Sequence, residues 1–121
     1  MTPDPDDLYA VLIKWASKRR WRPYTQLSHD YQARTGDWFE PHGSWDHPLG
    51  DLNRRLAPTG APPLSALVVV QGTDRPGRGF WGSAPNVPIS SNELEREAAW
   101  GRIVEEVFAY HGRTISRSAA R

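Results

Sequence analysis

Cysteine is absent from the 121 residues of this chain, and methionine occurs once. The absence of cysteine excludes disulfides, thiolate metal ligands and cysteine nucleophiles, and it fits a reducing compartment. No apolar stretch approaches the roughly 18 residues that a membrane-spanning helix needs. The acidic start, Met1 to Asp7, lacks the basic and apolar regions of a signal peptide. We therefore expect a cytoplasmic protein without a membrane segment.

Tryptophan, in contrast, is abundant, with six copies beside four tyrosines and three phenylalanines. Tryptophan fills cores and also anchors interfaces, so some of these side chains are candidates for a surface role. The length and an apolar fraction of 38% predict one domain over residues 1–121. We expect its core in residues 6–89, a C-terminal helix at about 91–111 and a polar tail at 112–121.

The net charge of +1 hides two segments of opposite sign. Between Lys14 and Arg34 there are six cations and one carboxylate, whereas between Ser90 and His111 there are five carboxylates and two arginines. Such segregation indicates two faces with different partners.

Apolar residues at helical spacing predict three helices in the first half of the chain. The first covers residues 6–20. The second covers residues 26–35, with Thr25 as its N-cap and Gly36 as its stop. The third covers residues 48 to about 56; it has Pro48 in its first turn and His47 as its cap. Its apolar side is expected to be Leu49, Leu52 and Leu56, which leaves Asp51, Asn53, Arg54 and Arg55 facing outward.

The second half begins with the longest apolar run in the chain, residues 64–70, which predicts a buried strand. A glycine-rich turn at residues 73–79 would return the chain to a second strand starting at Phe80 and Trp81. Ser90, with Glu93 three residues later, has the pattern of a capping box for the last helix. This order predicts an α+β winged helix, namely a three-helix core with a two-stranded wing, followed by a long C-terminal helix.

Several short motifs resemble the winged-helix domain of the DNA alkyltransferase and alkyltransferase-like family. Tyr24-Thr-Gln-Leu27 is similar to the family's Tyr-Gly-Glu-Leu, and His47-Pro-Leu-Gly50 with Asn53-Arg54-Arg55 is similar to its recognition helix. Pro63-Leu-Ser-Ala-Leu-Val-Val69, followed by Gly77-Arg-Gly-Phe80, stands where that family has Pro-Cys-His-Arg-Val-Val and a glycine-rich turn. The resemblance covers about half of the chain and implies a DNA-binding fold.

Two departures from the family decide the chemistry. Its nucleophilic cysteine falls at or near Leu64 and Ser65, and the arginine that it inserts into the duplex falls at His47. Alkyl transfer is therefore excluded, and we expect no enzymatic activity and no cofactor. The Pro-Leu-Ser-Ala-Leu-Val-Val run before a Pro-Gly-x-Gly-Phe turn also resembles small modules of bacterial defence proteins.

A DNA-binding module, such as a small bacterial or phage regulator, is the first functional prediction. Arginine can pair with guanine and asparagine with adenine in the major groove, and wing arginines can contact phosphate or the minor groove. The predicted contacts to double-stranded DNA are Asn53, Arg54, Arg55, Arg75, Arg78, Lys18, Arg20 and Arg22. Two features weigh against this assignment: Asp51 would repel phosphate, and residues 18–20 also suit a helix C-terminus that neutralises its own dipole.

A protein-interaction module on the same scaffold, such as an adaptor or inhibitor in phage–host defence, is the alternative. Trp38, Phe39 and Trp45 in the loop before the third helix could anchor a partner. Two of the three are expected to cover the helical core instead. The apolar stripe of the last helix, which includes Trp100, Ile103 and Val107, could pack on its own domain or form a homodimer.

Histidines and aspartates gather at His29, Asp30, His42, Asp46 and His47, and imidazole with carboxylate could bind zinc or act as acid and base. The spacing matches no established metal signature, so no metal site and no catalytic residue are predicted. A metal-dependent hydrolase remains the third possibility. His111, on the apolar stripe, is expected to be a half-buried histidine with a hydrogen-bond partner.

Overall fold

The first helix begins at a strong sequence signal for a helix start. Asp4 precedes α1 (Pro5–Ser17), and its carboxylate accepts hydrogen bonds from the backbone N–H groups of Asp6 at 2.8 Å and Asp7 at 3.3 Å. Leu8, Leu12 and Trp15 lie on its buried side. The helix predicted over residues 6–20 is therefore confirmed, although it ends three residues earlier.

The next two helices also lie where helical spacing places them. Helix α2 (Tyr24–Thr35) ends at Gly36, whose φ of 85° is in the left-handed region that glycine tolerates. It starts before Thr25, which is therefore not its N-cap. Helix α3 (Asp46–Leu56) has Pro48 in its first turn as predicted, but His47 lies inside the helix rather than capping it.

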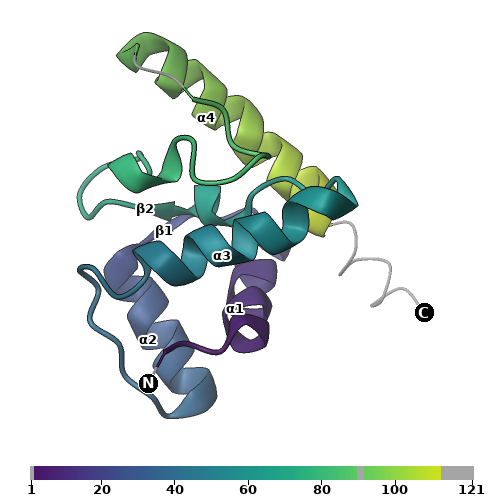
Figure 1. Cartoon of the computed structure of the whole chain (residues 1–121). Helices are drawn as coiled ribbons and strands as arrows, with labels where there is room; N and C mark the ends of the chain where they lie inside the picture. Colours follow the sequence, from purple (N-terminus) through teal and green to yellow (C-terminus); the bar gives the residue numbers. More distant parts are fainter. Residues whose placement is uncertain (1, 90–91, 113–121) are drawn as a thin grey trace.

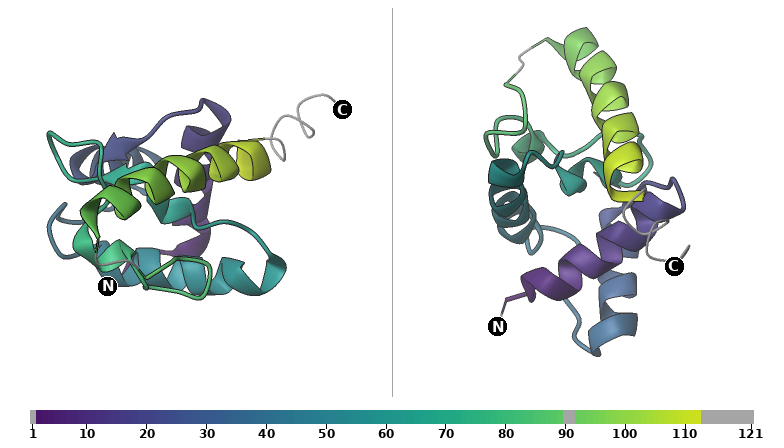
Figure 2. Two further views of the ribbon diagram at one scale, coloured as in Figure 1. Left: turned by 90° about the horizontal axis from the view of Figure 1, so that it is seen from above. Right: turned by 90° about the vertical axis from the view of Figure 1, so that its right-hand side faces the viewer.

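The computed structural model describes residues 2–89 and 92–112. Its last helix, α4 (Glu93–Val107), is capped by the Asn92 side chain and continues as a wider π-helical turn over Phe108–Gly112. The cap predicted at Ser90 falls outside the described residues. Figure 1 shows the N-terminal turns of α4 far from α1 and α2, and the views in Figure 2 place its C-terminal end beside α1.

The predicted two-stranded wing is wrong. In residues 2–89 and 92–112 the strands are β1 (Arg22–Pro23) and β2 (Val68–Val69), which pair in parallel with Arg22 opposite Val68. The chain at Phe80 forms one turn of 3-10 helix (Arg78–Phe80) instead of a return strand. The fold is thus a small helical α+β structure in which a short parallel sheet joins the start of α2 to the middle of the chain.

A buried polar contact explains why the apolar run begins as a helix rather than as a strand. Leu64–Leu67 forms a 3-10 helix. The Asn53 side chain donates to Ser65 Oγ at 2.6 Å and accepts from the Ser65 backbone N–H at 3.4 Å. Because this N–H bonds to a side chain of α3, it is not available to a strand ladder. The run is buried as predicted, and only its secondary structure differs.

The core is shared by α1, α2, α3, the 64–69 segment and the inner side of α4. Ile103, Val104, Val107 and Phe108 of α4 are buried against the rest of the chain. Of the two alternatives for the apolar stripe, packing on its own domain is therefore the one that these residues show, and a homodimer through this helix stays a prediction. No helix in the described part of the chain combines the length and the apolar character that crossing a membrane requires.

Candidate binding surfaces and pocket

The outward face of α3 is neutralised by carboxylates of the same chain. Arg54 forms an ion pair with Asp51 and donates to the Ser83 carbonyl at 3.0 Å. Asp51 also lies 3.0 Å from His47 Nε2. Arg55 lies 3.8 Å from Asp6 at the start of α1. Arg54 and Arg55 face outward as predicted, but each is paired with a carboxylate.

Asn53 does not face outward, so this part of the prediction is wrong. Its residue exposure is 0%, and its amide is occupied by the two hydrogen bonds to Ser65. An amide buried in this way cannot reach a base edge. Its polarity serves the packing of α3 on the following segment.

The two arginines of the predicted wing have separate outcomes. Arg75 forms an ion pair with Glu93 at the start of α4, so a carboxylate also neutralises this cation. The backbone of Arg78 begins the 3-10 turn before Trp81, and its side chain lies outside the described part of the structure. Arg75 therefore borders α4 instead of projecting from a free hairpin.

Most cations at the end of α1 and in the segment that follows it are not paired with a carboxylate of the described residues. Lys14, Lys18, Arg20 and Arg22 have no carboxylate within 4.0 Å among the residues that the structure describes. Arg22 donates to the Trp21 carbonyl at 3.2 Å. Arg19, between them, differs: it pairs with Glu105 at 2.7 Å and lies 4.9 Å above the Phe108 ring.

The aromatic loop before α3 is mostly core. Trp45 is fully buried, and its indole N–H donates to Ser28 Oγ at 2.9 Å. Phe39 is half-buried and packs against Trp45 with ring centroids 5.7 Å apart. Trp38 is 41% exposed and lies on His29, with ring centroids 5.2 Å apart. The prediction that two of the three aromatics cover the core is confirmed.

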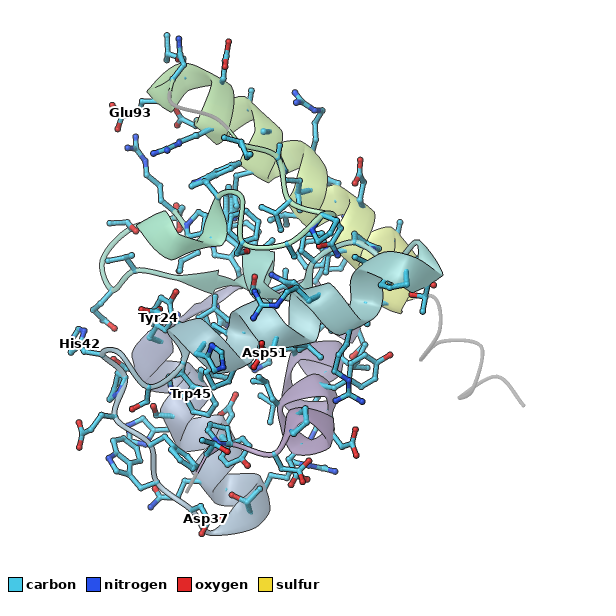
Figure 3. The ribbon with its side chains drawn as sticks, viewed as in Figure 1. Tyr24, Asp37, His42, Trp45, Asp51 and Glu93 are labelled. Atoms are coloured by element: carbon cyan, nitrogen blue, oxygen red, sulfur yellow. The ribbon has the colours of Figure 1, made fainter. Side chains whose placement is uncertain are left out.

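The histidines do not form a shared site. No group of three or more His, Cys, Asp or Glu side chains within the described ranges is arranged to hold a metal ion. His42 is exposed at the edge of the molecule, as Figure 3 shows. His111 is 1% exposed and its Nε2 lies 3.1 Å from the Pro62 carbonyl. Burial lowers the pKa of His111, and the bond to Pro62 partly opposes this shift.

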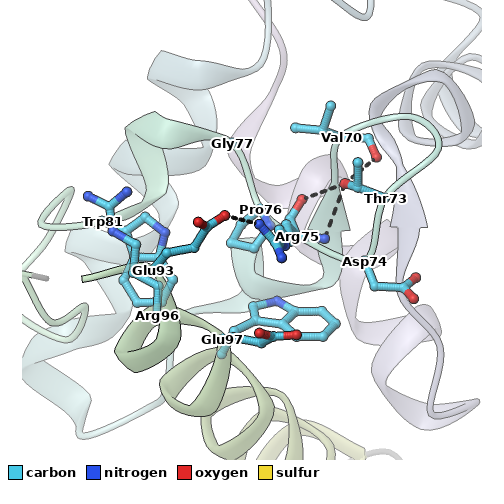
Figure 4. Close-up of a pocket in the computed structure, with 11 residues that line it drawn as sticks. Val70, Thr73, Asp74, Arg75, Pro76, Gly77, Trp81, Glu93, Arg96 and Glu97 are labelled. Atoms are coloured by element: carbon cyan, nitrogen blue, oxygen red, sulfur yellow. Dashed lines mark hydrogen bonds and ion pairs between the residues drawn. The ribbon is translucent and has the colours of Figure 1, made fainter. Parts of the chain in front are cut away.

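The sequence did not predict the pocket that lies between residues 70–77 and α4. Its volume is about 470 Å³. Figure 4 shows Arg75 reaching Glu93 across one side, with Arg96 next to Trp81 and Glu97 on the α4 side. The lining residues are Val70, Thr73, Asp74, Arg75, Pro76, Gly77, Trp81, Glu93, Arg96, Glu97 and Trp100.

The loop side of the pocket is held in a fixed shape. The Val70 backbone N–H donates to the Arg75 carbonyl at 2.8 Å, and the Thr73 hydroxyl donates to the Val70 carbonyl at 2.9 Å. The Gly77 backbone N–H bonds to the Tyr24 hydroxyl. Burial raises the pKa of this hydroxyl to about 12, with a smaller contribution from Asp46, while the Gly77 bond opposes the rise. Tyr24 at the start of α2 therefore contacts residues 70–77 at Gly77.

The aromatic side of the pocket is fixed as well. The Trp100 indole N–H donates to the Ala66 carbonyl at 2.8 Å. Trp21 meets Trp100 edge to face, with centroids 5.3 Å apart, and donates to Asp74 at 3.1 Å. The Arg96 guanidinium lies 5.7 Å from the centre of the Trp81 ring. Trp81 and Trp100 pack on the core as predicted but remain half-buried. Both tryptophans and the charged residues between them are visible in the sequence, but their spacing does not indicate a pocket.

Comparison with protein-family models, with curated proteins and with solved structures finds no match to this chain. The resemblance to the alkyltransferase-like family therefore remains a prediction from short motifs.

Proposed function

We propose that this chain is a non-enzymatic protein-interaction module whose contact surface is the pocket between residues 70–77 and α4. The scaffold in this proposal is the helical part of a winged helix without its wing. This surface suits an adaptor or inhibitor that binds another protein, for instance in a phage–host defence system.

The observation that carries the proposal is exposed apolar surface beside a preformed aromatic pocket. Ile89 is 89% exposed and Leu94 is 77% exposed. Leu94 follows the pocket residue Glu93, and Ile89 lies against Gly82, next to Trp81. Val70, which lines the pocket, is 42% exposed. Exposed apolar side chains around a rigid aromatic pocket, with a polar rim, are the usual composition of a protein-binding hot spot.

The neutralised face of α3 supports the same choice. A surface in which each cation is paired with a carboxylate of its own chain attracts the phosphate backbone weakly, because nucleic-acid affinity depends on unpaired positive charge. Trp38 is the remaining candidate from the aromatic loop. Figure 3 places its neighbour Asp37 at the opposite end of the molecule from Glu93, so Trp38 cannot belong to the same contact surface.

Capture of a native partner by the purified chain tests this proposal. We expect a protein to be retained from the native lysate by the wild type and lost by the double substitution Ile89→Ser and Leu94→Ser. Both side chains are exposed, so the fold should be unchanged. Tyr110→Ser is the matched control, because Tyr110 is an exposed aromatic in the turn that follows α4 and lies outside the pocket. Equal retention by the double variant and the wild type would reject the pocket end as the contact surface.

DNA binding through the basic segment after α1 is the second candidate. The observation in its favour is the absence of a carboxylate within 4.0 Å of Lys18, Arg20 or Arg22 in the described residues. A cavity of about 820 Å³ between α1 and α2 adjoins this segment, and Lys14 and Lys18 line it together with Asp30 and with Arg34, which is paired with Asp7. Unpaired cations are the groups that release counterions from a duplex.

Salt-dependent binding to a labelled duplex tests the second candidate. If three cations contact phosphate, the slope of log K against log salt should be roughly −2.7, from about −0.9 per contact. Lys18→Ala with Arg20→Ala should reduce this slope by about two, whereas Arg54→Ala with Arg55→Ala should leave it nearly unchanged. A larger loss in the Arg54 and Arg55 variant would place the contact on α3, and absence of binding at low salt would reject DNA binding.

A further inference from the structure

The pocket between residues 70–77 and α4 also indicates which chemistry a partner must present. We propose that it binds the cationic side chain of an arginine in a partner protein, seated against the tryptophans and paired with Glu97. This inference rests on the proposed protein-interaction function and specifies its ligand.

The charges around the pocket favour a cation. Three carboxylates and two guanidinium groups line it. Arg75 is paired with Glu93, and Asp74 accepts the indole N–H of Trp21. Glu97 is exposed and has no hydrogen bond or ion pair within the described ranges. The lining therefore carries a net negative charge, and Glu97 is the carboxylate available to an incoming group.

The aromatic walls favour a guanidinium in particular. Arg96 lies 5.7 Å from the centre of the Trp81 ring, within the distance at which a cation is attracted to an aromatic face, so the incoming guanidinium would stack on Trp100 beside this pair. Trp100 lines the same cavity, and its hydrogen bond to the Ala66 carbonyl fixes its orientation. Rings that are already ordered lose little entropy on binding, so a stacked guanidinium keeps most of its interaction energy.

An anionic ligand is disfavoured at the same place. The positive end of the α4 dipole would attract an anion, but the first turns of α4 carry Glu93, Glu95 and Glu97. Glu93 and Glu97 line the pocket beside the two arginines, so both carboxylates would repel a phosphate or carboxylate that entered it. The occupant that fits is therefore a basic peptide segment rather than a nucleic acid.

Titration with acetyl-arginine-amide tests the inference without a known partner. The matched probe is acetyl-citrulline-amide, which has nearly the same shape and no charge. Binding is followed through the indole N–H signals in a proton–nitrogen correlation spectrum, with the Trp81 signal assigned from the Trp81→Phe variant. We expect the arginine probe to shift the Trp81 and Trp100 signals with a dissociation constant of about 1–10 mM, and the citrulline probe to bind at least tenfold more weakly.

Two glutamates of α4 provide the matched substitutions. Glu97→Gln should weaken arginine binding about fivefold, as expected for the loss of one half-exposed charge-assisted contact. Glu106→Gln should leave it unchanged, because Glu106 lies outside the pocket. Far-UV circular dichroism confirms that both variants are folded.

The outcomes separate this inference from the function on which it rests. No shift of the Trp81 and Trp100 signals, equal binding of citrulline, or an unaffected Glu97→Gln variant would overturn the arginine assignment. A partner that is lost with Ile89→Ser and Leu94→Ser but is not displaced by the arginine probe would keep the interaction module and reject its proposed ligand. Arginine binding without any partner that depends on Ile89 and Leu94 would instead reject the proposed function.

Discussion

A single buried amide connects α3 to the segment that leads into β2. Asn53 bonds to both the hydroxyl and the backbone N–H of Ser65, and both residues are buried. Polar groups removed from water are tolerated only when they are paired. Asn53 therefore acts as a structural residue in a helix whose exposed side chains are charged.

Asn53→Ala should destabilise the protein by roughly 2 kcal/mol or more, since it leaves two buried polar groups of Ser65 without their partner. Thermal or urea unfolding measures this loss. The double substitution Asn53→Leu and Ser65→Ala should cost less than the sum of the single changes, because it removes the hydroxyl together with the amide. If the loss of stability in the double variant equals the sum of the two single losses to within about 0.5 kcal/mol, Asn53 and Ser65 are not coupled.

At the scale of elements, the helices were predictable and the sheet was not. The spacing of Leu8, Leu12 and Trp15, and the glycine at position 36, locate α1 and the end of α2 from local chemistry. The run Leu64–Val70 is apolar except for Ser65, and periodicity cannot distinguish a buried strand from a buried helical turn. Pairing with β1 depends on residues more than forty positions away, about which local patterns carry no information.

The pocket was unpredictable for the same reason. Trp81 and Trp100 were expected in the core, which is correct for their packed edges. Their exposed faces enclose a cavity only because α4 returns beside residues 70–77. The partners of Arg54, Arg55 and Arg75 likewise depend on tertiary placement, so the sequence indicated their charge but not its neutralisation.

Helix α4 is held to the body by its inner face, and Val107 is the residue that tests this. Val107 is fully buried. Val107→Asp should destabilise the fold by roughly 3 kcal/mol or more, because an unpaired carboxylate would be placed in the core. Its neighbour Glu106 is exposed, and Glu106→Asp should change the stability by less than about 0.5 kcal/mol. Equal melting curves for the two variants would contradict the packing of α4 described above.

At the scale of the whole molecule, the first helix and the turn that follows α4 meet at His111. Its ring faces Tyr9 of α1 and Tyr110, with centroid separations of 6.4 and 4.9 Å, and it contacts the Pro62 carbonyl. The neighbouring Gly112 lies so close to α1 that a Cβ added there would be 3.1 Å from the Ala16 carbonyl. The C-terminal turn is thus part of the folded body.

The lowered pKa of His111 makes the global stability depend on pH. Below about pH 6.5 the unfolded chain binds a proton that the folded protein resists, so stability should decrease as the pH falls from 7 toward the folded-state pKa. The melting temperature at pH 5.5 should accordingly be a few degrees lower than at pH 7.5. His111→Gln should flatten this dependence, while His29→Gln, an exposed control, should retain it. A wild type whose melting temperature does not change over this range would contradict the burial of a neutral imidazole.

Trp21 stands where the two candidate surfaces adjoin. Its chain neighbours are the cations Arg20 and Arg22, while its ring contacts Trp100 and Phe108 and its N–H bonds to Asp74. Anything that settles on the basic segment or in the pocket changes the surroundings of this indole. The molecule therefore carries one of its six tryptophans at the junction of the two surfaces, and the indole N–H signal of Trp21 can report whether two occupants compete or coexist.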